Sequence, residues 1–190
     1  MEYTGPAQFC PPNGISSLLE AMRTNARQGS RELDGLLLEY PSDARLHFLK
    51  GSSLAEEGGD IQAARAAMQR AVDLAPDHVM TRFQFGFHLL AWGEVGAAQE
   101  IWRPLLSLPD AHYVHHLVKG LYHLINEEIE EALRLLQSGI AGNNENQPTN
   151  RDMQLIVDAV VDRLHYGRMR EAPASSVDSL LQQAALKPKS

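Results

Sequence analysis

One pattern recurs in three segments of the chain: IQAARAAMQRAVDL (61–74), VGAAQEIWRPLLSL (95–108) and IEEALRLLQSGIAG (129–142). Each segment has an aliphatic residue first, an alanine fourth and a large apolar residue eighth. The three segments begin 34 residues apart, and the same spacing relates Ser52, Gly86 and Gly120. A period of this length, with two helical runs in each unit, predicts stacked pairs of helices.

Together with the stretches that precede these segments, the apolar periodicity predicts two helices in each unit. The predicted first helices cover 44–57, 79–92 and 111–126, and the predicted second helices cover 61–74, 95–107 and 129–140. A degenerate pair precedes them, with its first helix over 15–26 and its second ending near Tyr40. The predicted fold is therefore all-α, a right-handed superhelical array of antiparallel helix pairs over residues 14–166.

The small residues predict where the helices approach most closely. We expect Ser52, Gly86 and Gly120 at the contact between the two helices of a unit, because a larger side chain would force these helices apart. The alanines at positions 64, 98 and 132 are expected to be buried, and Ala98 almost completely. Met68, Trp102 and Leu136 are expected to fill the wider gap beyond.

Local signals predict where the helices begin and end. Three aspartates precede the first helices and are candidate N-caps: Asp43, Asp77 and Asp110. In the first pair, Gly29 and Ser30 are predicted to form the turn, with Ser30 as the N-cap. Pro104 lacks a backbone donor, so the second helix of the middle unit should kink or stop near Arg103.

The two ends of the chain are predicted to differ from the array. Residues 1–13 carry three prolines and are expected to form a flexible arm with an exposed Cys10 thiol. A polar loop is predicted over 142–150, followed by an amphipathic capping helix over 151–166 with Thr149 or Asn150 as its cap. The predicted apolar stripe of that helix is Met153, Ile156, Val157, Val160, Val161 and Leu164. Residues 167–190 are expected to hold a linker and a weak helix near 177–186.

Composition narrows the classes of function. The net charge of −7 argues against a protein that mainly grips nucleic-acid phosphates, which would need a basic face. The single cysteine cannot form an intrachain disulfide, which fits a reducing compartment, and we expect a cytoplasmic protein. No signal peptide and no apolar run long enough for a membrane span are evident in the sequence.

Histidine is the only residue type whose grouping suggests chemistry. Four histidines lie on one predicted helix: His112, His115, His116 and His123. His112 and His116 are four residues apart, a spacing that can hold zinc or nickel on one helix face. A third ligand is not evident, so we expect structural or solvent-facing histidines and no metal or other cofactor.

Residues 43–141 resemble the tetratricopeptide repeat family in the columns described above. The resemblance implies a scaffold in which the first helices of successive units line a concave groove that receives a peptide or a helix. One subtype of the family binds a carboxylate through basic and amide side chains on that groove. The corresponding positions here are Leu49, Ser53, Gln84, Val114 and Val118, so this basic clamp is absent.

The predicted groove is apolar and draws on the middle and third units. Its candidate partner-binding residues are Met80, Phe83, Phe87, Leu90, Val114, Leu117, Leu121 and Leu124. Any of them can alternatively be ordinary core between helices. A surplus apolar stripe would mark a partner site for an amphipathic helix or an extended segment, or for the protein's own C-terminal helix.

The predicted function is that of an adaptor or chaperone that binds an apolar segment of another protein, and not of an enzyme. Type III translocator chaperones share this size and architecture, although no motif here separates them from other short arrays. Two alternatives stay open. One is a structural subunit that self-associates, so that the chain is a homo-oligomer, and the other is a metal-binding enzyme built around the histidines. We expect neither nucleic acid nor membrane as a partner.

Overall fold

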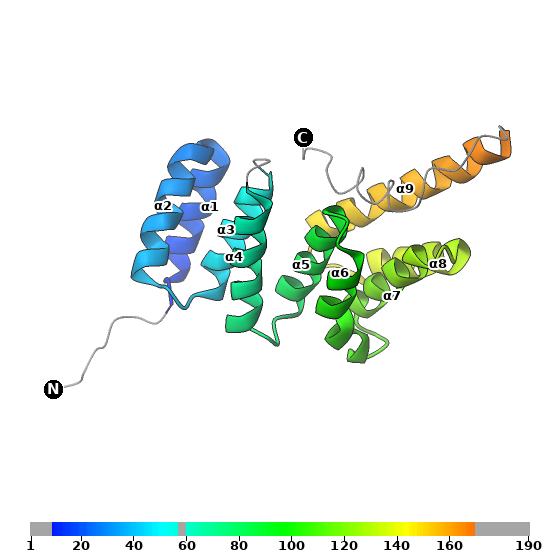
Figure 1. Ribbon diagram of the computed structural model, residues 1–190, viewed down its shortest axis with the longest axis horizontal. Coiled ribbons are helices and arrows are strands. Elements are labelled where there is room, and N and C mark those ends of the chain that lie inside the picture. The colour runs from blue at the N-terminus through cyan, green and yellow to red at the C-terminus, as the bar shows by residue number, and fades with distance from the viewer. Residues whose placement is uncertain (1–8, 57–59, 170–190) are drawn as a thin grey trace. The chain divides into compact units, whose positions relative to one another are not determined.

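The computed structural model describes residues 9–56 and 60–169, and in these ranges all regular structure is helical (Figure 1). The predicted all-α class is thus confirmed for the described part of the chain. The linker and weak helix predicted beyond residue 169 lie outside the described residues, as do positions 1–8 of the predicted arm. The helices are α1 (Pro12–Thr24), α2 (Ala26–Glu39), α3 (Ala44–Glu56), α4 (Ile61–Leu74), α5 (Val79–Ala91), α6 (Val95–Trp102), the 3₁₀ helix η1 (Arg103–Ser107), α7 (Tyr113–Ile125), α8 (Ile129–Gly142) and α9 (Gln147–Met169).

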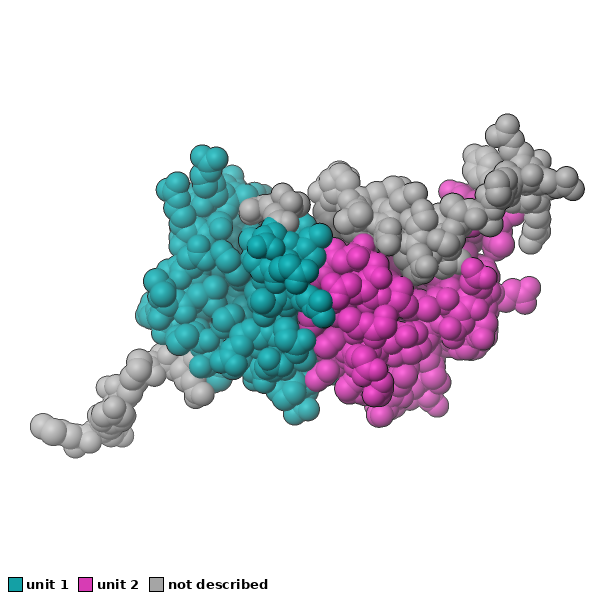
Figure 2. Space-filling model, in the orientation of Figure 1, with its two compact units in different colours: residues 1–81 teal, residues 82–190 magenta. Residues whose placement is uncertain are grey.

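The chain divides into two compact units, residues 1–81 and residues 82–190 (Figure 2). The first unit contains α1 to α4, and α2 packs on both α1 and α3. The second unit contains α6 to α9 and all of α5 except its first three residues. None of the helices in the described ranges is long and apolar enough to cross a lipid bilayer.

The helix starts keep the 34-residue spacing predicted from the sequence, except that α3 and α5 begin 35 residues apart. The second helices α4, α6 and α8 begin at residues 61, 95 and 129, and α3, α5 and α7 begin at 44, 79 and 113. α6 ends at Trp102, and the chain continues as the 3₁₀ helix η1 with Pro104 near its start. The predicted break near Arg103 is confirmed, because proline removes the donor that a further α-helical turn would need.

A glycine faces a large side chain at the seam of each hairpin. Gly86 lies against the indole of Trp102, and a methyl group added to Gly120 would lie 2.8 Å from Leu136 Cγ. In the α3–α4 hairpin this place belongs to Gly51, opposite Met68, and not to the predicted Ser52. The prediction was wrong there by one position, because α3 and α5 begin 35 residues apart instead of 34. The alanines at 64, 98 and 132 are all fully buried, as predicted.

The first hairpin turns earlier than the sequence suggested. Gly29 and Ser30 lie inside α2, and the predicted turn at these residues is wrong. The turn lies at Asn25, whose side chain accepts a hydrogen bond from the Gln28 amide at 3.2 Å and caps α2. Gly29 is buried against Met22, so its lack of a side chain allows α1 and α2 to approach closely.

Histidines, and not the predicted aspartates, cap two of the three first helices. Asp43 accepts a hydrogen bond from the Arg45 amide and begins α3 as predicted. Asp77 and Asp110 are not the caps. His78 Nδ1 accepts from the Thr81 amide at the start of α5, and His112 Nδ1 accepts from the Val114 amide at the start of α7, both at 3.2 Å.

Cys10 is buried, so the predicted exposed thiol is wrong, as is a flexible arm that reaches residue 13. The Cys10 amide donates to Asp43 Oδ2 at 2.9 Å, and Arg45 Nη2 donates to the Cys10 carbonyl at 2.6 Å. Arg45 also pairs with Asp43, so one carboxylate anchors both the start of α3 and the segment before α1. Burial, and next the charge of Asp43, raise the pKa of the Cys10 thiol.

Helix α9 begins before the predicted position, and the predicted loop over 142–150 is correspondingly shorter. The Asn146 side chain accepts from the Thr149 amide at 3.1 Å and caps the helix, so neither Thr149 nor Asn150 is the cap. Asn143 is buried and organises the turn, because its Oδ1 accepts from the Glu145 and Asn146 amides. Four stripe residues are buried as predicted, namely Met153, Ile156, Val157 and Val160, whereas Val161 is half-buried and Leu164 is exposed.

Candidate interaction face

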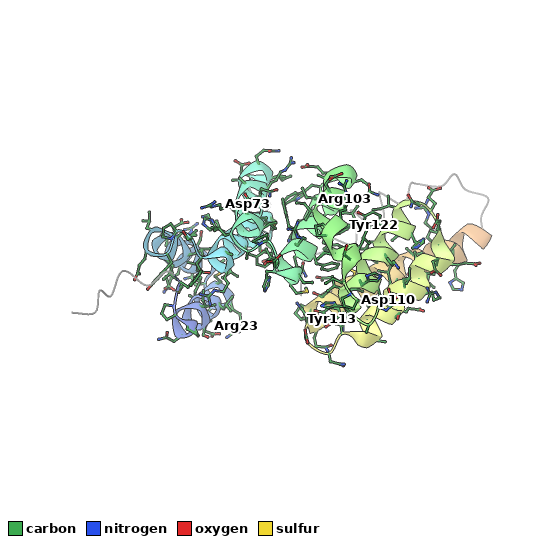
Figure 3. The ribbon with its side chains drawn as sticks, turned by 90° about the horizontal axis from the view of Figure 1, so that it is seen from below. Arg23, Asp73, Arg103, Asp110, Tyr113 and Tyr122 are labelled. Atoms are coloured by element: carbon green, nitrogen blue, oxygen red, sulfur yellow. The ribbon has the colours of Figure 1, made fainter. Side chains whose placement is uncertain are left out.

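Helix α7 packs against neighbouring helices on two of its sides. Leu117 lies against Gly139 of α8, and Gly120 lies against Leu136 of the same helix. On the opposite side, the Tyr122 hydroxyl donates to the Gln99 carbonyl of α6 at 2.7 Å, and Arg103 lies near this tyrosine (Figure 3). These two sides are the seams that hold α7 to α8 and to α6.

A third side of α7 is apolar and belongs to neither seam. Each helical residue turns by about 100°, which places Val114, Val118 and Leu121 roughly midway between the α8 side and the α6 side. All three residues are fully buried. The 3₁₀ helix η1 also packs on α7, so these residues lie between the seam to α8 and the contacts with α6 and η1.

Helix α5, like α7, has one side that faces a neighbouring helix and another side that corresponds to the third side of α7. Phe83 stacks on Trp102 of α6 with ring centroids 6.3 Å apart, and the Trp102 indole N–H donates to the Phe83 carbonyl at 2.9 Å. Gln84 and Phe87 lie on the side corresponding to Val118 and Leu121, because each precedes its counterpart by 34 residues. We define Gln84, Phe87, Val114, Val118 and Leu121 as the α5–α7 face.

Helix α9 is the element that begins on this face. The Gln84 side-chain amide donates to Thr149 Oγ1 at 3.0 Å, a contact between residues 65 positions apart, and Thr149 is fully buried. From there α9 packs along α8, with its first turns near α5 and its later turns leading away from it (Figure 1). Helix α9 thus packs on α8, and its first turn meets the α5–α7 face through Gln84 and Thr149.

The structure shows how far the predicted groove residues are buried and on which side of their helix each one lies. All of them except the half-buried Met80 are buried in the folded chain, and their role in binding a partner stays a prediction. Phe83 and Leu117 belong to the seams with α6 and α8. Leu90 and Leu124 point to the same seam sides by their helical position. Phe87, Val114 and Leu121 belong to the α5–α7 face, and binding of a partner there stays a prediction.

The sequence indicated Thr149 only as a candidate cap of α9, and not as a contact of α5. The 34-residue period relates Gln84 to Val118, but it ends before α9 and says nothing about which helix meets Gln84. A threonine one turn into an amphipathic helix appears as an ordinary first-turn residue. Only the three-dimensional path of the turn at Asn143–Asn146 brings Thr149 to α5.

The histidines on α7 occupy separate environments. His112 caps the helix, and the His123 Nδ1 atom contacts the Glu128 carboxylate. His115 and His116 meet edge to face with ring centroids 6.0 Å apart. Across residues 9–56 and 60–169, no three histidine, cysteine, aspartate or glutamate side chains are grouped so that they could hold a metal ion.

His115 is the buried member of the group. Its Nε2 atom lies 3.2 Å from Asp110 Oδ1, yet neither ring nitrogen has a well-formed hydrogen bond. Burial, with the charges of Lys119 and His116, lowers the pKa of His115, although Asp110 and the Leu108 carbonyl act in the opposite direction. The neutral imidazole is therefore the form that the folded unit accommodates.

A hollow lies on the first unit. It is a shallow, open depression of about 310 Å³ between α1 and α2, lined by Gly14, Ser17, Leu18, Glu32, Gly35 and Leu36. Glu32 is its only ionisable lining residue. Of its lining side chains, only Ser17 and Glu32 are polar.

Comparison with known proteins gives no family for the chain. No family model matches the sequence, and no curated protein matches it significantly. The class that the described residues establish is an all-helical protein whose successive helices pack on one another.

Proposed function

We propose that the protein is an interaction module of the tetratricopeptide type, an adaptor or chaperone that binds an apolar segment of another polypeptide through the α5–α7 face. The described helices of each unit would then be parts of one right-handed array. The repeated helix starts and the glycine-to-large-residue seams support this architecture. Its partner is a protein segment, and it performs no reaction.

The observation that carries the proposal is the apolar third side of α5 and α7. Val114, Val118 and Leu121 are fully buried and lie between the sides of α7 that face α6 and α8. A helical-hairpin scaffold completes its core through neighbouring repeats, so apolar positions beyond the seams mark a surface that accepts another helix or strand. In the folded chain α9 begins on that surface.

Partner capture from the native lysate tests the proposal with a matched pair of variants. Leu121→Ala and Leu124→Ala remove the same atoms from fully buried positions of the same helix, and each should cost about 2–5 kcal/mol of stability. Only Leu121 belongs to the α5–α7 face. Leu121→Ala should therefore release the captured partner at a temperature where both variants remain folded.

Two results would count against this function. Equal capture by both variants would place the binding surface elsewhere, and loss of capture by both would show that only overall stability matters. Self-association is examined by light scattering in the same preparations. A homo-oligomer that does not dissociate on dilution would favour the structural-subunit alternative.

A further inference from the structure

We propose that Asn13, in the first turn of α1, is a modification site whose side-chain amide is converted to a carboxylate when that turn opens. Asn13 is exposed, and Gly14 follows it directly. An asparagine followed by a glycine loses its amide most readily, because glycine leaves the backbone free to bring the next nitrogen to the side chain. The inference concerns the first unit and does not depend on the proposed function.

Packing requires the glycine that makes this pair reactive. A side-chain carbon added to Gly14 would lie 2.9 Å from Cys10 Sγ, which is closer than unbonded atoms pack. The Cys10 side chain is buried in the core of the first unit, so the thiol has little room to move away. The fold therefore places a glycine directly after an exposed asparagine.

The helical conformation keeps the pair unreactive. The Gly14 amide donates to the Pro11 carbonyl at 2.9 Å, and the Ile15 amide donates to the same carbonyl at 3.2 Å. Loss of the Asn13 amide begins when the Gly14 nitrogen attacks the side-chain carbonyl carbon of Asn13. A helical ψ of about −42° holds that nitrogen away from the side chain. The Asn13 backbone must therefore leave the helix before the reaction begins.

The reaction in the opened turn needs only water and hydroxide. Hydroxide removes the Gly14 amide proton, and the nitrogen forms a bond to Asn13 Cγ. The bond from Cγ to the side-chain nitrogen then breaks, ammonia leaves, and a cyclic imide remains. Water opens the imide at either of its carbonyl groups, which gives aspartate or isoaspartate. The net change consumes water and releases ammonia, and nothing is oxidised or reduced.

The segment before α1 controls how often this turn opens. The N-cap residue Pro11 makes no side-chain hydrogen bond to the helix. Instead, the Cys10 amide donates to Asp43 Oδ2, and Arg45 Nη2 donates to the Cys10 carbonyl. These bonds fix the residue that precedes Pro11 and so hold the start of α1. Removing the Asp43 carboxylate should let the turn open more often and should speed the conversion of Asn13.

The two products have opposite effects on the turn. Aspartate adds a negative charge to the first turn of α1, which has no acidic residue, and the helix dipole favours this charge. Isoaspartate carries the chain through its side chain and adds a methylene to the backbone. The Gly14 amide then no longer meets the Pro11 carbonyl in helical register. Formation of isoaspartate should thus keep the turn open and free the Cys10 amide from Asp43.

Incubation of the full chain in a mildly alkaline buffer tests the proposal. Mass spectrometry of peptides follows the conversion of Asn13, and chromatography separates aspartate from isoaspartate. Wild type should convert slowly when folded and rapidly when unfolded in urea. Folded Asp43→Ala protein should convert roughly tenfold faster than folded wild type, or more. The control is Asp60→Ala, which removes the exposed cap of α4 in the same unit and should convert at the wild-type rate.

Three results would overturn the proposal. Equal rates in folded and urea-unfolded wild type would show that α1 does not protect Asn13, and no conversion in urea would show that the pair is not reactive. Equal acceleration by Asp43→Ala and Asp60→Ala would show that unfolding of the whole unit, and not the anchor, controls the reaction. If Asp43→Ala does not fold, Asp43→Asn keeps the shape without the charge and serves in the same comparison.

Hydrogen exchange of the Cys10 amide tests the effect on the turn. This amide should exchange faster in the purified isoaspartate form than in wild type, whereas Asn13→Asp should keep its protection, because only isoaspartate lengthens the backbone. Unchanged protection in the isoaspartate form would show that the modified turn closes again, and the role of the modification in releasing the segment before α1 would fall.

Discussion

At the residue scale, one glycine in each hairpin sets how close two helices come. Gly86 lies against the Trp102 indole, and that indole donates to a carbonyl of α5, so the ring has little freedom to move away. The position of Gly86 in a helix interior would otherwise favour alanine. The close approach, and not backbone conformation, is the reason for glycine here.

Gly86→Ala should destabilise the second unit by about 1–3 kcal/mol, because the added methyl overlaps the indole and forces α5 and α6 apart. Gly96→Ala is the control, since nothing lies within 4 Å of an added methyl there and the site is on the exposed side of α6. It should stabilise by roughly 0.5–1 kcal/mol through helix propensity. Urea denaturation measures both, and a neutral Gly86→Ala would contradict the seam.

Buried His115 makes stability depend on pH. Its folded pKa lies below the ordinary value of 6.5, so protonation favours the unfolded chain. The stability of the second unit should be complete above pH 6.5 and should fall as the pH drops from 6.5 toward the folded pKa. His115→Gln, which does not titrate, should flatten this part of the pH profile.

His165→Gln is the matched control for His115, because His165 is exposed on α9. It should leave the pH profile as in wild type. The profile comes from the urea midpoint between pH 5 and pH 8. If wild type and His115→Gln lose the same stability across this range, another group is responsible.

At the element scale, two aspartates cap helices of the first unit by different means. Asp60 accepts from the Gln62 and Ala63 amides at 2.9 and 3.2 Å and is exposed. Asp43 is buried and accepts from the Cys10 amide as well as from the backbone and guanidinium of Arg45. Burial raises the pKa of Asp43, but the hydrogen bonds from Arg45 and Cys10 prevail and lower it below 3.8.

Asp43→Ala should therefore cost about 3 kcal/mol, the loss expected when a buried, hydrogen-bonded charge is removed from its partner. Asp60→Ala should cost about 1 kcal/mol, as for an ordinary N-cap. Thermal or urea unfolding followed by circular dichroism compares the two. The Asp43 contribution is present above the unfolded pKa and is lost as the pH falls through the folded pKa, so it persists at pH 5. Equal losses from the two substitutions would refute the anchor.

At the scale of the whole molecule, the chain consists of two compact units with their own cores. The first core gathers Cys10, Leu18, Leu33 and Leu46. The second contains an aromatic group of Phe83, Phe87, Trp102 and Tyr122. Both tryptophans of the sequence, Trp92 and Trp102, belong to the second unit, so their fluorescence reports on that unit.

Gly51→Ala and Gly86→Ala make the same change in the two units. Gly51→Ala should lower the midpoint followed by circular dichroism more than the midpoint followed by tryptophan fluorescence. Gly86→Ala should lower the fluorescence midpoint directly. A single transition that moves equally under both probes for both variants would show that the units unfold as one.

Residue spacing was enough to predict the helical part of this protein between residues 44 and 140. The 34-residue period predicted helices from residue 44 to residue 140, the buried alanines and the break at Pro104, because these depend on spacing and on the chemistry of single residues. The prediction was wrong where two nearby residues could each cap the same helix. Asn25 replaced Ser30 as a cap, and His78 and His112 replaced the neighbouring aspartates, since each backbone donor takes the nearest well-oriented acceptor.

The tertiary structure alone decided which apolar residues remain for function. The sequence shows four apolar residues on the predicted helices, namely Phe83, Phe87, Leu117 and Leu121. It does not show which of them face α6 or α8 and which belong to the α5–α7 face. That distinction depends on which helices lie next to α5 and α7, and the chain reaches this arrangement only through the turn at Asn143–Asn146. The same turn brings Thr149 to Gln84 across 65 residues and so places the first turn of α9 against α5. No local pattern encodes a contact of that range, because it results from the packing of all the intervening helices.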